Sequence, residues 1–169
     1  ATYDIVIEPK MSFGTGHHAT THLVAEEMLN ERYDNQVVLD MGSGTGVLAI
    51  LAEKLGAAEA VAIDNNPWAV ENSEENVARN GCSSITVTQD EADNLPKNKF
   101  DTILANINRN VLLVQGAAYF ASLKSGGSLL LSGILIEDQP LIKEHFEKLG
   151  FSFIKSNHRD KWCMLRFKK

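Results

Sequence analysis

A glycine-rich stretch, "LDMGSGTG", has the residue types of a loop that holds a nucleotide. Gly42, Gly44 and Gly46 are spaced two residues apart and follow Asp40. Glycines let the backbone turn sharply and approach a ligand closely. A dinucleotide-binding pattern would need a glycine where this chain has Val47, and a lone glycine loop also fits a plain tight turn. An apolar run before the loop and a helical pattern after it favour the nucleotide site.

Acidic residues are expected on either side of that loop. Asp64 ends the next apolar run, 22 residues after Gly42, where a carboxylate can accept both ribose hydroxyls of an adenosine. Asp90 follows the third apolar run, where it could accept a hydrogen bond from an adenine amino group; for both acids a plain turn residue is the alternative. Asp40 would repel a pyrophosphate but tolerate a sulfonium or an amino group. Together these acids favour S-adenosylmethionine over NAD as the cofactor.

Short apolar runs alternate with helical patterns along the chain, which predicts a parallel sheet with helices on both faces. The last two runs, "FSFIKS" and "WCMLRF", have a connection too short for a parallel crossover and are predicted to pair antiparallel. We therefore expect an α/β fold of about seven strands, mostly parallel, with one antiparallel strand near an edge. The first five strands are predicted at 37–41, 60–64, 84–89, 100–107 and 128–134. Helices are predicted between them at 47–55, 67–80 and 111–123, and a last helix after them at 139–149.

Composition limits the classes of function. A chain of 169 residues with 44% hydrophobic and 22% charged residues suits a single globular domain. The formal net charge of −6 disfavours a broad nucleic-acid interface, and the apolar runs are too short to span a bilayer. Cys82 and Cys163 are the only cysteines. Such sparse usage favours free structural thiols in a reducing cytoplasm.

Five stretches of the chain are, in order, "FGTGHHATT", "VLDMGSGTGVLAI", "AVAIDNNPWAVENSEENVARNG", "ANINRN" and "LKSGGSLLLSGIL". They resemble the class I S-adenosylmethionine-dependent methyltransferases and, within them, the ribosomal protein L11 methyltransferase family (PrmA). The resemblance implies a Rossmann-like methyltransferase domain over residues 1–169 and an N-methyltransferase that acts on lysine and α-amino groups of a ribosomal protein. The charge and the short apolar runs predict no direct nucleic-acid or membrane partner. The family's amino-terminal substrate-recognition domain is expected to be absent from this chain.

The resemblance also assigns roles to individual residues. Thr21, Gly42, Asp64 and Asn106 match the family's cofactor contacts, and the stretch "FGTGHHATT" is expected to fold over the bound cofactor. Phe13 could then cover the reactive methyl group and exclude water.

Local chemistry adds further expectations for the same stretch. Thr20 or Thr21 could cap a helix that begins at about His22. The family usually has Thr-His-Pro where this chain has His17, His18 and Ala19, so the substrate-facing details of this loop differ. The histidines lack the third or fourth ligand that a metal site usually needs, and we predict no metal.

Asn106 and Phe13 are the predicted catalytic residues, and Asn106 is the one that could position the acceptor. Methyl transfer from a sulfonium is an in-line displacement, so the protein mainly has to position the donor and the acceptor. An amine acceptor must first lose a proton, because lysine has a pKa near 10.4 and an α-amine near 8. The Asn106 side-chain oxygen, expected at the end of a strand, could accept an N–H bond and aim the lone pair. A strand-end cap is the alternative role for this residue.

Other functions stay open at this point. The chain could methylate another amine, an amide or a small molecule, or it could be a non-catalytic cofactor-binding module within a complex. An NAD-dependent oxidoreductase is disfavoured by Asp40 and by the missing glycine at position 47.

Overall fold

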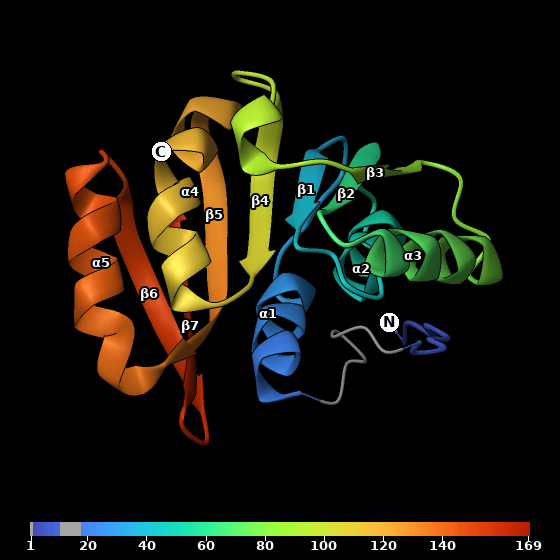
Figure 1. Cartoon of the computed structure of the whole chain (residues 1–169), viewed down its shortest axis with the longest axis horizontal. Coiled ribbons are helices and arrows are strands. Elements are labelled where there is room, and N and C mark those ends of the chain that lie inside the picture. The colour runs from blue at the N-terminus through green and yellow to red at the C-terminus, as the bar shows by residue number, and fades with distance from the viewer. Residues whose placement is uncertain (1, 11–17) are drawn as a thin grey trace.

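The structure, a computed structural model, describes residues 2–10 and 18–169. These residues form one seven-stranded sheet with helices packed on both faces (Figure 1). The helices are α1 Ala19–Leu29, α2 Val47–Lys54, α3 Pro67–Arg79, α4 Arg109–Ser122 and α5 Gln139–Lys148, and short 3-10 turns lie at Ala92–Asn94 and Ile136–Asp138. The strands are β1 Val37–Met41, β2 Glu59–Asp64, β3 Ile85–Gln89, β4 Phe100–Asn106, β5 Leu123–Leu135, β6 Ser152–Arg159 and β7 Trp162–Lys168.

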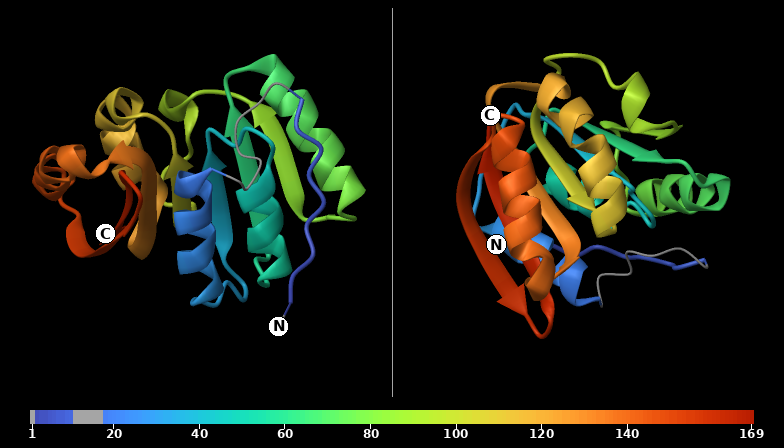
Figure 2. Two further views of the ribbon diagram at one scale, coloured as in Figure 1. Left: turned by 90° about the horizontal axis from the view of Figure 1, so that it is seen from below. Right: turned by 60° about the vertical axis from the view of Figure 1, so that its left-hand side comes forward.

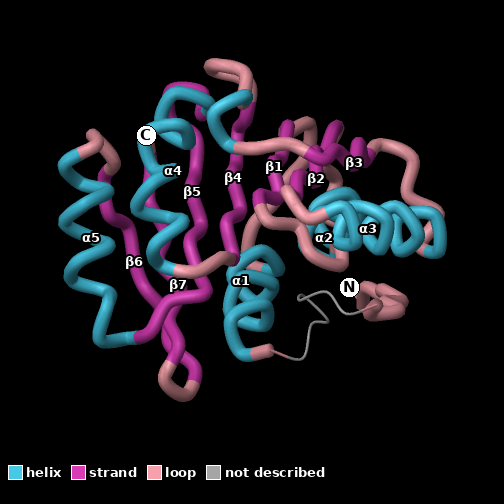
Figure 3. The backbone as a smooth tube through the Cα atoms, in the orientation of Figure 1, coloured by secondary structure: helices cyan, strands magenta, loops and turns pink. Residues whose placement is uncertain are grey.

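The strands lie in the order β3-β2-β1-β4-β5-β7-β6 across the sheet. Strands β1 to β5 pair in parallel, and β7 pairs antiparallel with both of its neighbours, β5 and β6. Figure 3 shows the strands in magenta together with the cyan helices that flank them. The predicted α/β, Rossmann-like sheet with one antiparallel strand near an edge is confirmed.

Two helix boundaries follow from capping residues that the sequence already indicates. The Asn66 side chain accepts the Trp68 N–H at 2.9 Å, and Pro67 occupies the first turn of α3. Helices α2 and α3 are followed by Gly56 and Gly81, which have positive φ angles of 103° and 64°. Glycine adopts such angles without steric cost and therefore ends helices readily.

Helix α1 begins earlier than the sequence predicts. It starts at Ala19, and its N-cap is His18, whose Nδ1 accepts the Thr20 N–H at 3.3 Å. The expected start at about His22, with Thr20 or Thr21 as the cap, was wrong. Histidine is not among the side chains that usually cap helices, so composition gave no signal for it. Thr21 instead lies in the first turn and is buried.

Strand β5 is longer than predicted. It begins at Leu123, and its pairing with β4 jumps from Leu123 opposite Phe100 to Ser128 opposite Thr102. The intervening "KSGG" bulges out of the ladder, and Gly126 there has a φ of 77°. The turn residues therefore interrupt the strand locally, but pairing with β4 on both sides of them continues it.

The apolar core lies on both faces of the sheet. Helices α4 and α5 cover one face with a cluster rich in aromatic rings, and α1 and α2 cover the other face with mainly aliphatic side chains. Helix α3 packs beside α2 over β2 and β3. None of the helices in the described part of the chain is long and apolar enough to cross a membrane.

Residues 2–10 form an extended segment outside the sheet. They run alongside α3, as the dark blue trace in Figure 2 shows, and hydrogen-bond to its side chains. This segment is called the N-terminal strap below.

Candidate functional site

A pocket lies where the chain reverses its direction of travel across the sheet. The chain passes from β1 outward to β3 and then returns to β4 on the other side of β1. Ligands of open α/β sheets bind at this switch point, beyond the carboxyl ends of the strands. The pocket brings together four of the predicted site residues, and its lining consists of Thr21, Asp40, Gly42, Ser43, Val47, Leu48 and Asn106.

Gly42 shapes the floor of this pocket. Its φ is 73°, and a Cβ added there would lie only 2.3 Å from Cγ2 of Ile107, which follows β4. Its N–H donates to the Ile63 carbonyl at 2.8 Å. Because no other residue combines this angle with this lack of a side chain, Gly42 is required by close packing of the loop after β1 against the loop after β4.

The side chain of Asp40, a residue of β1, lies at the amino end of α2. It is 2% exposed, and its Oδ2 accepts the N–H of Ala49, in the first turn of α2, at 3.1 Å. The N-cap of this helix is Gly46, which has no side chain that could accept a hydrogen bond from the first turn. Burial raises the pKa of Asp40 to about 7; the Ala49 hydrogen bond opposes this shift, and the charge of Asp64 adds to it. The anion-binding end of the helix is thus already taken by a carboxylate.

Asp64 joins the glycine loop to the end of β2. Its Oδ2 accepts the Gly44 N–H at 3.0 Å, and its Oδ1 accepts the Asn66 N–H at 3.0 Å. The acid and the glycine loop are therefore adjacent, as their spacing in the sequence predicts. A carboxylate oxygen can accept more than one hydrogen bond, so both oxygens retain capacity for a ligand.

Asp90 lies next to Asp64 at the end of β3. Its N–H donates to the Asp64 carbonyl at 3.2 Å. Its Oδ1 accepts the Asn94 side-chain amide at 2.6 Å and the Glu91 N–H at 2.8 Å. These two hydrogen bonds, that from Asn94 first, lower the pKa of Asp90.

Asn106 faces Thr21 across the pocket. Its Nδ2 donates to the Thr21 Oγ1 at 3.1 Å, which links the end of β4 to the first turn of α1. This contact uses the amide nitrogen and turns the Asn106 Oδ1 away from Thr21. The structure thus places the two residues together although they are 85 positions apart in the chain.

Helix α3 supports the glycine loop from behind, which the sequence patterns did not identify. Ser73 Oγ donates to the Gly44 carbonyl at 2.8 Å, and Asn76 Nδ2 donates to the Thr45 carbonyl at 3.0 Å. Ser73 and Asn76 are fully buried. The available signal was a helix whose core-facing side carries polar residues, Asn72 included, where apolar ones are expected.

Phe13 and the histidines of the stretch "FGTGHHATT" lie only partly within the described residues. Phe13 and His17 lie outside the described residues, so the expected cover over a reactive methyl group stays a prediction. The His18 ring packs edge-on against Trp162, with 5.1 Å between ring centroids. Among residues 2–10 and 18–169, no cluster of three or more His, Cys, Asp or Glu side chains could hold a metal ion.

The sequence profile of a protein family described as "Ribosomal protein L11 methyltransferase (PrmA)" matches residues 2–169. The chain belongs to the ribosomal protein L11 methyltransferase family. The match confirms the resemblance seen in the five sequence stretches, and it extends over both sides of the pocket.

Relatives in this family are similar over nearly the whole chain. The ribosomal protein L11 methyltransferase of Bacteroides thetaiotaomicron is 45% identical over 168 residues, which are 99% of this chain and 60% of the relative. That of Porphyromonas gingivalis is 46% identical over 97% of this chain and 57% of its own length. The chain therefore spans about 60% of the length of the relatives it matches.

Solved structures agree with the family. A ribosomal protein L11 methylase from Lactobacillus delbrueckii superimposes with a TM-score of 0.87 at 29% identity, over 95% of this chain and 82% of that one. An S-adenosylmethionine-dependent methyltransferase from Mesorhizobium loti has a TM-score of 0.73 at 14% identity, covering 90% of this chain and 99% of the other. The second likeness shows the fold alone.

Proposed function

We propose that this chain is a methyltransferase domain that binds S-adenosylmethionine in the pocket between β1 and β4. In this proposal it transfers the methyl group to amino groups of ribosomal protein L11. Family membership supports the reaction class. The observation that carries the choice of cofactor is the Asp40 carboxylate at the amino end of α2.

Asp40 fits a positively charged ligand and opposes a pyrophosphate. A dinucleotide places its pyrophosphate at the helix amino terminus that follows the glycine loop. Here the Ala49 N–H at that terminus is already bonded to the buried carboxyl group of Asp40, and above the Asp40 pKa of about 7 a phosphate beside it would meet like charge. A cationic group would instead offset the desolvation that raises the pKa of Asp40. An NAD-dependent oxidoreductase is therefore the poorer fit.

Asp64 and Asp90 are the proposed nucleoside contacts. Asp64 would accept the ribose hydroxyls, because both of its oxygens keep lone pairs beyond the Gly44 and Asn66 N–H groups. Asp90 would accept the adenine amino group from the end of the neighbouring strand. The register of β2 and β3, in which Asp64 pairs with Gln89, supports a nucleoside that lies across the two strand ends.

Asn106 is the proposed positioning group for the acceptor amine. When bound, S-adenosylmethionine supplies an electrophilic methyl group on a sulfonium. Asn106 donates through Nδ2 to Thr21, so its Oδ1 can accept an N–H from a neutral amine and orient the lone pair. Phe13 would exclude water from the same place.

The ribose assignment is tested with Asp64→Ala. Loss of the hydrogen bonds that two ribose hydroxyls would donate to a charged carboxylate should weaken binding of S-adenosylhomocysteine, the cofactor without its transferable methyl group. The expected loss is roughly 10- to 100-fold, measured by titration calorimetry. Asp93→Ala, which removes an exposed acid from the turn after β3, is the control and should bind normally. Unchanged affinity in Asp64→Ala would reject the proposed ribose contact. Tight binding of NAD by the unaltered chain would reject S-adenosylmethionine as the cofactor.

The acceptor assignment is tested with Asn106→Ala. Turnover should fall by about 10- to 1,000-fold while the affinity for S-adenosylhomocysteine changes far less, because the oxygen acts on the acceptor rather than on the cofactor. Asn110→Ala, at the start of α4, is the control. Normal turnover in Asn106→Ala would remove this residue from the mechanism.

The protein substrate is tested separately, because the chain spans about 60% of the length of its relatives. Ribosomal protein L11 and a short lysine peptide are each incubated with the chain and labelled S-adenosylmethionine. Methylation of L11 above that of the peptide supports the proposal, and methylation of small amines alone favours a different substrate. The substrate implies a cytoplasmic location, with which the free thiols of Cys82 and Cys163 agree.

A further inference from the structure

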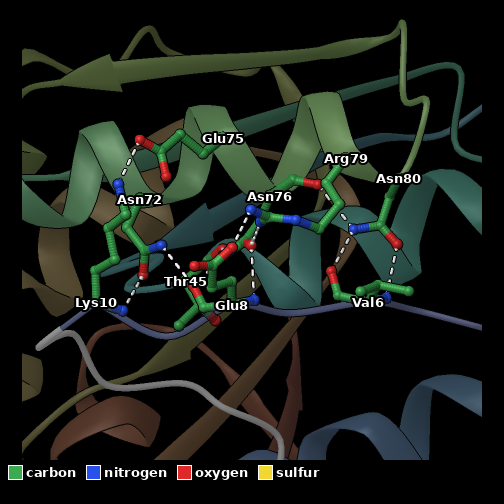
Figure 4. Close-up of polar contacts among 9 residues, drawn as sticks. All are labelled: Val6, Glu8, Lys10, Thr45, Asn72, Glu75, Asn76, Arg79 and Asn80. Carbon is green, nitrogen blue, oxygen red and sulfur yellow. Dashed lines mark hydrogen bonds and ion pairs between the residues drawn. The ribbon is translucent and has the colours of Figure 1, made fainter.

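Two asparagines of α3, Asn72 and Asn76, and its C-cap Asn80 bind the backbone of the N-terminal strap (Figure 4). Asn80 and Val6 exchange two hydrogen bonds of 2.8 Å each, from the Val6 N–H to Oδ1 and from Nδ2 to the Val6 carbonyl. The Glu8 N–H donates to Asn76 Oδ1 at 3.0 Å, and the Lys10 N–H donates to Asn72 Oδ1 at 3.2 Å. Asn72, Asn76 and Asn80 are called the asparagine ladder below.

The asparagine ladder can bind every second residue of the strap because the spacing of its residues on the helix matches that of alternate residues in an extended chain. Asparagines four residues apart on a helix are separated by about 6 Å along its axis. Alternate residues of an extended chain are separated by about 6.6 Å, so every second residue of the strap meets the next turn of α3. The ladder contacts backbone atoms of the strap and is therefore indifferent to its side chains. Ion pairs of Lys10 with Glu75 and of Glu8 with Arg79 add charge complementarity.

Asn76, the middle asparagine of the ladder, contacts both the strap and the glycine loop. Asn76 is fully buried; it accepts the Glu8 N–H of the strap and donates to the Thr45 carbonyl of the glycine loop at 3.0 Å. It also donates to the Glu8 carbonyl at 3.4 Å, and its Oδ1 accepts a second hydrogen bond, from Arg79 Nη1 at 2.7 Å. One amide group thus touches both the strap and the loop that lines the pocket, and its orientation is set by partners on both sides.

We propose that Asn76 is a positioning residue for the glycine loop and that docking of the strap is coupled to cofactor binding through it. This inference rests on the proposed function. With the strap in place, the Glu8 N–H and Arg79 Nη1 both donate to Oδ1, which directs Nδ2 to the Thr45 carbonyl. Without the strap, Oδ1 keeps only the Arg79 donor of its own helix and Nδ2 loses the Glu8 carbonyl, so the side chain is no longer fixed from the strap side and can turn away from the loop. Coupling of this kind is reciprocal, so a bound cofactor also holds the strap.

The main test is Glu8→Pro, which removes the N–H that Asn76 accepts. Its matched control is Glu8→Ala, which removes the ion pair with Arg79 but keeps the N–H. We expect Glu8→Pro to weaken S-adenosylhomocysteine binding by about fivefold or more, the lower end of typical coupling between two sites, and Glu8→Ala by less than twofold. Titration calorimetry well below the unfolding temperature of each variant measures both.

Amide hydrogen exchange supplies a measurement that needs no ligand. Glu8→Pro should speed exchange at Val6 and Lys10 of the strap and also at Gly46, whose N–H bonds to the Ser43 carbonyl within the loop. In the unaltered chain, S-adenosylhomocysteine should slow exchange at Val6 and Lys10. Unchanged exchange at Val6 and Lys10 in Glu8→Pro would contradict the claim that the asparagine ladder holds the strap on α3. A freed strap with unchanged Gly46 exchange and unchanged affinity would overturn the coupling.

Asn76→Asp separates the two sides of the amide. A carboxylate can still accept the Glu8 N–H, but it cannot donate to the Thr45 carbonyl. The strap should therefore stay protected while affinity falls, a pattern that general destabilisation would not produce; affinity equal to that of the unaltered chain contradicts the proposal. If the unaltered chain binds no S-adenosylhomocysteine, the proposed function fails, but exchange at Gly46 still decides whether the strap orders the loop.

Discussion

Different kinds of contact surround the two halves of the sheet, β1 to β3 on one side and β5 and β7 on the other. Around β1, β2 and β3, buried side chains of α3 hydrogen-bond to the glycine loop, and small alanines let α2 lie close to β2. Around β5 and β7, aromatic rings from α4, α5 and the strands pack on one another. The rings of this aromatic cluster include Tyr119, Phe146, Phe151 and Phe167.

The two kinds of contact do different things: one fixes the position of the glycine loop, and the other stabilises the fold. A hydrogen bond has a preferred distance and direction, so buried amides and hydroxyls behind the loop hold its backbone at defined positions. Apolar burial has no direction and scales with area, so the aromatic cluster stabilises the fold without defining where single atoms lie. The pocket is lined from β1, the glycine loop, α2, β4 and α1, next to the hydrogen-bonded half.

The largest effect on stability is expected in the aromatic cluster. Phe146→Ala, which empties a fully buried site between Phe151 and Phe167, should lower the free energy of unfolding by about 3–5 kcal/mol. Denaturant unfolding measures this. Phe153→Ala, at a partly exposed ring, is the control and should cost less. If Phe146→Ala folds but loses more than tenfold in S-adenosylhomocysteine affinity, the two halves are not separable as described.

A smaller loss of stability with a larger loss of binding is expected at the glycine loop. Gly42→Ala brings a Cβ within 2.3 Å of Ile107 at a φ of 73°, and should cost about 2–3 kcal/mol, the left-handed backbone accounting for roughly 1–2 of it. S-adenosylhomocysteine affinity should fall at least tenfold. Gly81→Ala is the matched control, with a φ of 64° and open space around its Cβ. It should keep full affinity; equal loss in both variants would contradict the shape argument.

A pH-dependent effect is expected from Asp40. Its pKa is raised from 3.8 to about 7 in the folded chain, so between these values the folded state holds a proton that the unfolded state has released. The free energy of unfolding therefore falls as pH rises from about 4 to 7, by at most about 1.4 kcal/mol per pH unit, and is level above. Asp40→Asn removes this contribution.

Ligand binding should show the opposite trend with pH. S-adenosylhomocysteine lacks the sulfonium charge but keeps an α-ammonium group, which favours ionised Asp40, so its affinity should rise with pH up to about 7 and then level off. Asp93→Asn, an exposed acid, is the control for both measurements. Parallel stability curves for Asp40→Asn and the unaltered chain would show that Asp40 does not titrate in this range.

The smallest effect is expected at the start of α1. His18→Ala removes the acceptor of the Thr20 N–H and the edge-on contact with Trp162, and should cost about 0.5–1 kcal/mol in denaturant unfolding. His22→Ala, in the exposed part of the same helix, should cost less. Equal costs would mean that His18 does not act as a cap.

Much of the fold and part of the site could be predicted because both depend on local patterns. The strands at 37–41 and 60–64, the N-cap Asn66, the helix-ending Gly56 and the spacing from the glycine loop to Asp64 all follow from neighbouring residues. A continuous apolar run indicates a strand covered on both faces, and capping residues mark helix ends. Adjacency of Asp64 and the loop then follows from parallel pairing of consecutive strands.

Contacts between distant residues could not be predicted in this way. Asn106 and Thr21 meet only because α1 packs across β4 and β5. The asparagines of α3 look like surface residues in the sequence, yet Asn76 is buried between the strap and the glycine loop. Their partners are residues 6, 8 and 10 and Thr45, more than thirty positions away, and periodicity carries no information on such pairs.

The amino-acid sequence by itself determined the alternation of strands and helices, the glycine loop with its acids, and the family. Tertiary structure alone decided that Asp40 closes the amino end of α2, that His18 begins α1, and that a strap on α3 reaches the loop through Asn76. The physical reason is that backbone propensity and hydrophobic period act over a few neighbouring residues. A hydrogen bond between buried groups depends on where packing places both of its ends.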